Sequence, residues 1–179
     1  GLSKKIKSVL KRYRIYDIKC AYQSEVIMET NDRRNELFAN AMCNLMKDKL
    51  AMSIDLLDEI INADSDDKLA YLARGSVYLK MNDSKNAIDD FDRALEIDAN
   101  HPKAFHLRGL AHEMAGDDDE ALQDFNRAID IDPGYGAAFY SRASLLTKMG
   151  QEDSAIEDMK MANQLSNINI ESALGAERL

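Results

Sequence analysis

The chain has 179 residues, of which 45% are apolar and 31% are charged, and its formal net charge is −9. This apolar content excludes an intrinsically disordered chain, and no stretch approaches the ~18 apolar residues of a membrane span. Two Pro and eight Gly leave few helix breakers, so we expect an all-α protein. Two cysteines cannot form the disulfide framework of a small secreted domain, and we therefore expect a cytoplasmic protein with reduced thiols.

Residues 1–33 are predicted to form a basic helical extension. Residues 1–19 carry seven bases and one acid, a net charge of +6, so the rest of the chain carries −15 to give the total of −9. Apolar and aromatic residues recur at helical spacing from Ile6 to Tyr16, which predicts an amphipathic helix over residues 3–16. Because the rest of the chain is acidic and repels nucleic acid at long range, we do not expect the main domain to bind nucleic acid.

Three roles are open for this extension. It could pack as a cap on the helices that follow it, dock in a groove of its own chain or of another subunit, or contact a membrane surface or nucleic acid through its bases. The membrane and nucleic-acid contacts are the least favoured of the three. The residues expected to carry the docking are Lys4, Lys5, Ile6, Lys7, Leu10, Lys11 and Tyr13.

Four consecutive repeats organise the chain from position 34 to position 169. The repeats are 34–67, 68–101, 102–135 and 136–169, and the second and third are identical at 11 of 34 positions. Each repeat carries two apolar stripes at helical spacing, so we expect a pair of helices in each. Gly and Asn tolerate the left-handed backbone that ends a helix. The turns between the paired helices are therefore expected at Asp48, Asn82, Gly116 and Gly150.

Two positions in the first helix of each repeat predict contacts between helices. One is restricted to small residues, which implies that the backbone there presses against the partner helix. It holds Ala41, Gly75, Gly109 and Ala143. The other holds Arg74, Arg108 and Arg142. We expect these arginines to form ion pairs with acidic residues of a nearby helix; a ladder that binds anions is the less favoured alternative.

The four repeats resemble the tetratricopeptide repeat family. The third repeat matches the family's spacing at Phe105, Arg108-Gly109, His112, Ala121, Phe125, Ala128 and Pro133, and the second at Tyr71, Arg74-Gly75, Tyr78, Ala87, Phe91 and Ala94. The first repeat departs most from the pattern, at Asn44, Ser53, Ile60 and Ser65. The resemblance implies a right-handed α-solenoid of four helix pairs, which binds a peptide or a partner helix in a concave groove and is not an enzyme.

The resemblance also implies which residues line the groove, because the first helices of the repeats form it. These are Asn35, Phe38, Met42, Leu69, Leu72, Ser76, Lys103, His106, Leu110, Ala137, Tyr140 and Ser144. Family members that grip the C-terminal carboxylate of heat-shock chaperones use a clamp of Lys, Asn, Asn, Lys and Arg. In one register of that clamp only Lys103 fits, and in the next register no residue fits, so a chaperone-tail clamp is disfavoured. The partly apolar groove suits an apolar or amphipathic segment.

The end of the chain and the remaining motifs add little chemistry. Residues 170–179 are expected to form a short capping helix and tail that cover the end of the array. The sequence has no Gly-rich phosphate loop and no zinc spacing of Cys and His, so no cofactor or metal is expected. The function expected is a non-enzymatic scaffold for protein–protein interaction. The alternatives are a self-assembly module, in which the basic extension docks on a neighbouring subunit of a homo-oligomer, and a secretion-type chaperone.

Overall fold

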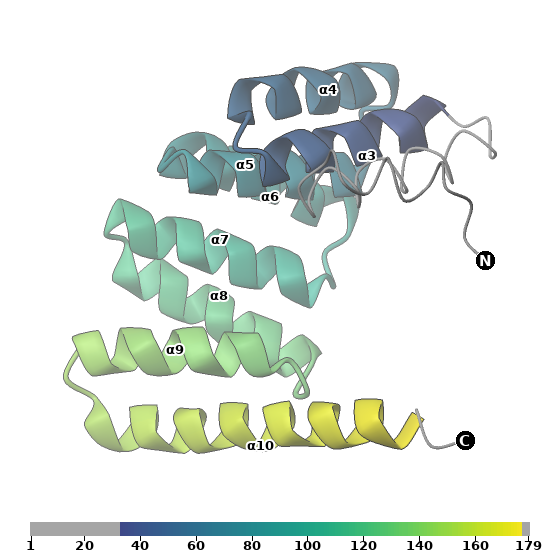
Figure 1. The fold of residues 1–179 in the computed structure, drawn as a ribbon. Helices are drawn as coiled ribbons and strands as arrows, with labels where there is room; N and C mark the ends of the chain where they lie inside the picture. Colours follow the sequence, from purple (N-terminus) through teal and green to yellow (C-terminus); the bar gives the residue numbers. More distant parts are fainter. Residues whose placement is uncertain (1–32, 177–179) are drawn as a thin grey trace. The chain divides into compact units, whose positions relative to one another are not determined.

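The computed structural model describes the backbone of residues 33–176 and the side chains of residues 33–166 (Figure 1). Within these residues the regular structure is helical, without strands, which confirms the all-α expectation. The helices are α3 (Arg33–Met46), α4 (Leu50–Ala63), α5 (Lys68–Lys80), α6 (Ser84–Ile97), α7 (Pro102–Ala115), α8 (Asp118–Ile131), α9 (Gly136–Lys148) and α10 (Glu152–Ala176). From α4 to α10, the starts of corresponding helices are separated by the period of the sequence repeat. Each of these helices is too short or too polar to span a lipid bilayer.

The four predicted turns adopt the backbone that their residues suggest. Asp48 and Asn82 have φ angles of 60° and 58°, and Gly116 and Gly150 have φ angles of 90° and 76°. All four lie in the left-handed region, where a residue other than Gly, Asn or Asp is strained. The next helix then starts two positions after each of them. Local residue choice therefore fixes where the first helix of each pair ends.

The chain divides into an N-terminal unit that ends at Val77 and a C-terminal unit that starts at Tyr78, and each has its own packing. In the N-terminal unit, α3 packs against α4 around a core of Ala41, Leu57, Ile60, Ala70, Ala73 and Val77. Ser53 stands in this core where the other three repeats have Ala. Its hydroxyl donates a hydrogen bond to the carbonyl oxygen of Ala41 at 2.9 Å, so the buried polar atom is satisfied. The atypical first repeat is therefore packed as a helix pair.

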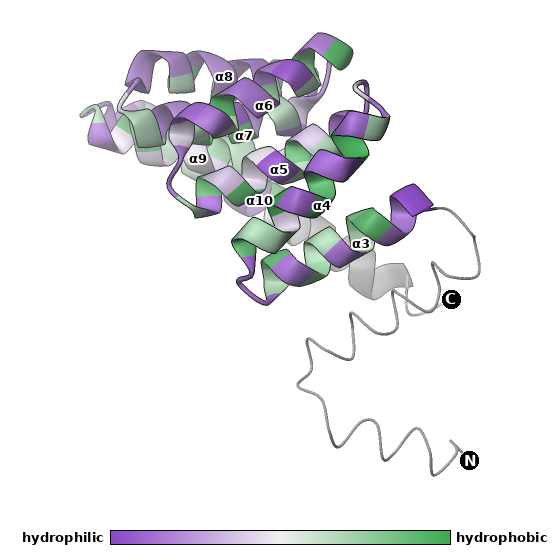
Figure 2. Cartoon of the chain, turned by 90° about the horizontal axis from the view of Figure 1, so that it is seen from above, coloured by the Kyte–Doolittle hydropathy of each residue, from purple (hydrophilic) through white to green (hydrophobic). Residues whose placement is uncertain are grey.

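In the C-terminal unit, successive helices from α6 to α10 pack against one another, and α7 also approaches α9. Figure 2 shows both hydrophilic and hydrophobic residues on α6 and α8, and these two helices are amphipathic. The small-residue position makes a close approach: a Cβ added to Gly109 would lie 2.6 Å from Cε1 of Phe125 and 3.2 Å from the carbonyl oxygen of Ala121. The predicted contact between backbone and partner helix is confirmed at this position.

Two features differ from the expectations. Residues 170–176 do not form a separate capping helix, because α10 runs without a break from Glu152 to Ala176. Between Glu152 and Leu174 the sequence contains no Pro or Gly that would stop a helix. Cys43 on α3 is disulfide-bonded, so the expectation of reduced thiols is wrong for this cysteine. The cytoplasmic location, which depended in part on that expectation, stays a prediction.

Candidate partner-binding surface

In the N-terminal unit, the predicted groove residues lie on α3 and α5 with mixed exposure. Phe38 and Met42 are partly buried and pack against the core of α3 and α4, and Asn35 is also partly buried. Leu69 is exposed on α5, whereas Leu72 is buried. Ser76 is partly buried, and its hydroxyl donates to the carbonyl oxygen of Leu72 one turn earlier at 2.7 Å.

Arg34 organises the start of this surface. Its guanidinium donates two hydrogen bonds to the carboxylate of Asp67, at 2.6 Å and 2.9 Å, and its Cζ lies 5.0 Å from the centre of the Phe38 ring. The hydrogen bond from Arg34 lowers the pKa of Asp67 below its ordinary value, although burial acts in the opposite direction. Arg34 thus ties the start of α3 to the residue that precedes α5.

In the C-terminal unit, the open part of the predicted groove lies on α9 and the first turn of α7. Lys103 is exposed on α7, and Ala137, Tyr140 and Ser144 are exposed along one side of α9. Tyr140 retains 60% of its accessible surface, the largest exposed fraction among the exposed large apolar and aromatic side chains of the described residues.

A hollow of about 480 Å³ lies beside Tyr140. Its lining consists largely of small residues from the start of α9 and the middle of α10, with Tyr135 and Tyr140 as the aromatic members. The lining is Gly134, Tyr135, Gly136, Ala137, Tyr140, Ala162, Asn163 and Ser166. The small residues leave room for a foreign side chain, and the amide of Asn163 and the hydroxyl of Ser166 offer hydrogen bonds to a ligand backbone.

Two predicted groove residues of α7 contribute to packing instead of to the open surface. His106 is only 8% exposed, and its Nδ1 lies 3.1 Å from the hydroxyl of Tyr135 while its Nε2 lies 2.9 Å from the hydroxyl of Ser141. One ring nitrogen donates and the other accepts, so a neutral imidazole satisfies both contacts. Burial, reinforced by the positive charge of Lys103, lowers the pKa of His106 from 6.5 to about 4. Leu110 packs against the core formed by Ala121, Phe125 and Leu145.

The difference between His106 and Tyr140 explains why the hollow is open. The two residues occupy equivalent positions in successive repeats. The ring of His106 lies edge-on to that of Tyr135 from the end of the same repeat, with their centres 5.3 Å apart. His106 is also contacted by Ser141 of the following helix pair, and no described helix follows α10 to make the equivalent contact with Tyr140. Tyr140 is therefore accessible to a ligand, whereas the equivalent His106 is covered by other residues of the chain.

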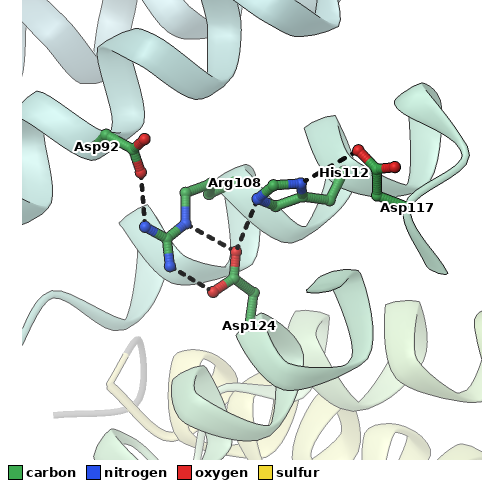
Figure 3. A network of polar contacts seen from close by, with 5 residues as sticks. All are labelled: Asp92, Arg108, His112, Asp117 and Asp124. Atoms are coloured by element: carbon green, nitrogen blue, oxygen red, sulfur yellow. Dashed lines mark hydrogen bonds and ion pairs between the residues drawn. The ribbon is translucent and has the colours of Figure 1, made fainter. Parts of the chain in front are cut away.

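The recurrent arginines are engaged in polar bridges between helices. Figure 3 shows Arg108 between two carboxylates: Nε and Nη2 donate to Asp124 at 2.9 Å and 2.7 Å, and Nη1 donates to Asp92 at 2.6 Å. Asp124 is buried, and its hydrogen bond is the main reason that the pKa of Arg108 is raised above its ordinary value. Arg142 repeats the arrangement with Asp158 and with the side-chain oxygen of Asn126.

These bridges confirm the expected ion pairs. Within the described residues, Arg108 and Arg142 are held by these bridges and do not form an anion-binding ladder. His112 lies in the same network, with Nδ1 3.8 Å from Asp117 and Nε2 4.0 Å from Asp124 (Figure 3). Across the part of the chain that the structure describes, no group of three or more His, Cys, Asp or Glu side chains is placed to hold a metal ion. The residues predicted to dock through the N-terminal extension, from Lys4 to Tyr13, lie outside the described residues.

Comparison with known proteins identifies the repeats. Residues 72–136, which span most of the second repeat and all of the third, match the family model described as "Tetratricopeptide repeat". This segment, about a third of the chain, is similar to tetratricopeptide repeats. A search of curated protein sequences gives no match.

Solved structures share the tetratricopeptide-repeat fold. A crystal structure of MamA has a TM-score of 0.71 and 20% identity, covering 96% of this chain and 99% of MamA. The first tetratricopeptide-repeat domain of Spaghetti (RPAP3), bound to the HSP90 peptide SRMEEVD, has a TM-score of 0.63 and 19% identity, covering 66% of this chain and 94% of that domain. The second such domain of human RPAP3, in complex with the HSP70 peptide SGPTIEEVD, has a TM-score of 0.57 and 27% identity, covering 59% of this chain and 88% of that domain.

Proposed function

We propose that the chain is a non-enzymatic protein-interaction module that binds a peptide or a partner helix on the first-helix surface of its tetratricopeptide repeats. The observation that carries the proposal is Tyr140, which stands 60% exposed beside a hollow of about 480 Å³. An exposed aromatic side chain next to a recess lined by small residues is a typical anchor point in protein interfaces. Two structurally similar domains, from RPAP3, are bound to chaperone peptides, which supports a peptide-binding role for the fold.

The chemistry of the surface favours an apolar or aromatic side chain over a carboxylate in the ligand. The hollow presents Gly136, Ala137 and Ala162, together with the polar side chains of Asn163 and Ser166. Its lining contains no cationic residue. Of the positions at which related domains would clamp a terminal carboxylate, only Lys103 is basic. We therefore do not extend the chaperone-tail ligands of the RPAP3 domains to this chain.

Two other roles stay predictions. Self-assembly through the basic N-terminal residues depends on residues 1–32, which lie outside the described residues. A secretion-type chaperone role has no residue signature of its own in this sequence.

The proposal can be tested with peptides selected on the full chain from a random phage-displayed library. Binding of the selected peptides is measured by fluorescence anisotropy for the wild type, Tyr140→Ala and Ala137→Glu. Tyr140→Ala removes the anchor and Ala137→Glu fills the hollow with a charge, so each is expected to weaken binding at least about tenfold. Met52→Ala is the matched control, because Met52 is 53% exposed on α4 and lies outside the predicted groove.

Peptides whose affinity is unchanged by both variants would place the site elsewhere. Loss of binding on Leu69→Ala, with Tyr140→Ala unchanged, would move the site to the N-terminal unit, where Leu69 is exposed on α5.

A further inference from the structure

Among the described residues, no helix covers the outer face of α10. One repeat earlier, Phe125 of α8 is fully buried and Leu122 is partly buried, because Leu145 and Met149 of α9 pack against the same cluster. The equivalent residues on α10 are Met159 and Ile156. They remain 37% and 52% exposed. In Figure 1, no described helix of the C-terminal unit lies on the side of α10 that faces away from α9.

The polar pattern of α10 shows what kind of helix would fit there. Between earlier repeats, an acceptor on the second helix binds the arginine of the next repeat: Asp92 accepts from Arg108, and Asn126 accepts from Arg142. The equivalent position on α10 is Lys160, which has no acceptor. A further helix of the repeat type would place its arginine against this cation. The helix that covers α10 is therefore expected to bring an acidic residue to Lys160.

The charges along α10 are complementary to those of a second, antiparallel copy of α10. Asp153, Ile156 and Lys160 follow one another at helical spacing, with Met159 beside Ile156. Asp153, near the start of this stretch, and Lys160, near its end, are both exposed, and neither has an ion pair within residues 33–166. When two such helices run antiparallel, Ile156 of each faces Met159 of the other. Lys160 of each then faces Asp153 of the other.

We propose that α10 is a homodimer interface, in which it packs antiparallel against α10 of a second copy of the chain about a two-fold axis near Ile156 and Met159. Such an isologous contact uses one surface twice and closes on itself, so it produces dimers and not filaments. The contact residues span about two turns of each helix. Two helices in contact over this length bury less than the ~1,200 Å² of a stable interface. The dimer is therefore weak and depends on protein concentration.

Sedimentation velocity of the full chain over a roughly hundredfold range of concentration measures this equilibrium. Ile156→Glu places like charges in the centre of the contact, and we expect the dissociation constant to rise at least about tenfold. Ile156 is exposed, so the helical circular dichroism should not change. Met52→Glu is the matched control: Met52 is equally exposed on α4, and its substitution should leave dimerisation unchanged.

Charge reversal tests the antiparallel orientation. Lys160→Glu and Asp153→Lys should each weaken the dimer, because each places like charges opposite one another. The double variant should restore the dimer, because Lys at position 153 of one copy then faces Glu at position 160 of the other. Single variants without effect, or a double variant without rescue, would overturn the proposal.

Two further outcomes would also overturn it. One is a chain that stays monomeric at every concentration. The other is a dimer that is insensitive to Ile156→Glu but lost when Lys4, Lys5 and Lys7 are changed to Glu, which would assign the contact to the basic extension. Tyr140→Ala should leave dimerisation unchanged, so failure of this proposal and failure of the peptide-binding proposal are separate results.

Discussion

Gly109→Ala is expected to destabilise the protein, although Ala is the better helix former. A Cβ at this position would lie 2.6 Å from Cε1 and 2.8 Å from Cδ1 of Phe125, and 3.2 Å from the carbonyl oxygen of Ala121. Carbon atoms in contact are ordinarily ~3.5–4.0 Å apart, so the ring would have to retreat by about 1 Å. Phe125 is fully buried between neighbouring helices, so its ring cannot retreat without displacing other side chains.

The magnitude follows from two opposing terms. Replacing a mid-helix Gly by Ala gains about 1 kcal/mol in helix propensity, and overpacking a buried site costs about 1–3 kcal/mol. With the Cβ this close to both a ring and a backbone oxygen, we expect the upper part of that range and a net loss of about 1–2 kcal/mol. Gly109→Leu should cost more. The first and fourth repeats have Ala at this position, and both lack the Phe that faces Gly109. Ala41 lies in a core with Leu57, and the repeat of Ala143 has Met159 at the position of Phe125.

Urea unfolding of a double-mutant cycle measures the effect. In a Phe125→Leu background the Ala side chain meets a smaller neighbour, so Gly109→Ala should cost about 1 kcal/mol less than in the wild type. Gly116→Ala is the control: it has a φ of 90° and no atom within 4 Å, so its cost is backbone strain and should not change with Phe125→Leu. The packing account would be refuted by a Gly109→Ala protein that is more stable than the wild type.

Two further predictions concern buried polar groups of the C-terminal unit. Because burial lowers the pKa of His106 from 6.5 to about 4, the unfolded chain takes up a proton as the pH falls below 6.5 while the folded chain does not. Stability should be complete above that pH and should fall by about 1–3 kcal/mol towards pH 4, and urea unfolding at pH 7 and pH 5 should show a smaller loss for His106→Gln. Arg108→Met leaves the buried carboxylate of Asp124 without its main partner and should cost about 2–4 kcal/mol in urea unfolding. Arg33→Met removes an exposed pair with Glu59 and should cost much less. Equal losses for the two arginine variants would contradict the bridge, and equal pH dependence of His106→Gln and the wild type would contradict the assignment to His106.

The repeat could be predicted from the sequence because its determinants are local. The period, a left-handed turn at Gly116 and a small residue at Gly109 each depend on neighbours within one helix pair. The arginine bridges were predictable in kind, since Arg108 recurs with acidic residues around it. Their partners required the structure, because each lies 16 residues away on another helix.

The candidate site was less predictable because exposure depends on the following repeat. His106 and Tyr140 are equivalent in sequence, yet one is buried beneath Tyr135 and Ser141 and the other is open. The period alone cannot distinguish them, since it treats every repeat as having a neighbour. The length of α10 was visible in the absence of Pro and Gly up to Leu174, but the assumption of a fixed repeat length placed a boundary at residue 170.

The arginine bridges constrain how such an array can change its length. Arg108 reaches 16 residues back to Asp92 and 16 residues forward to Asp124, and Arg142 spans the same two intervals to Asn126 and Asp158. After deletion or duplication of a whole repeat, each arginine would still have an acceptor 16 residues before it and another 16 residues after it. The buried carboxylates would therefore keep their partners. An insertion of any other length between the paired residues would separate arginine from aspartate and leave a charge buried alone. Gain and loss of complete repeats is therefore the evolutionary route that this hydrogen-bonding scheme tolerates.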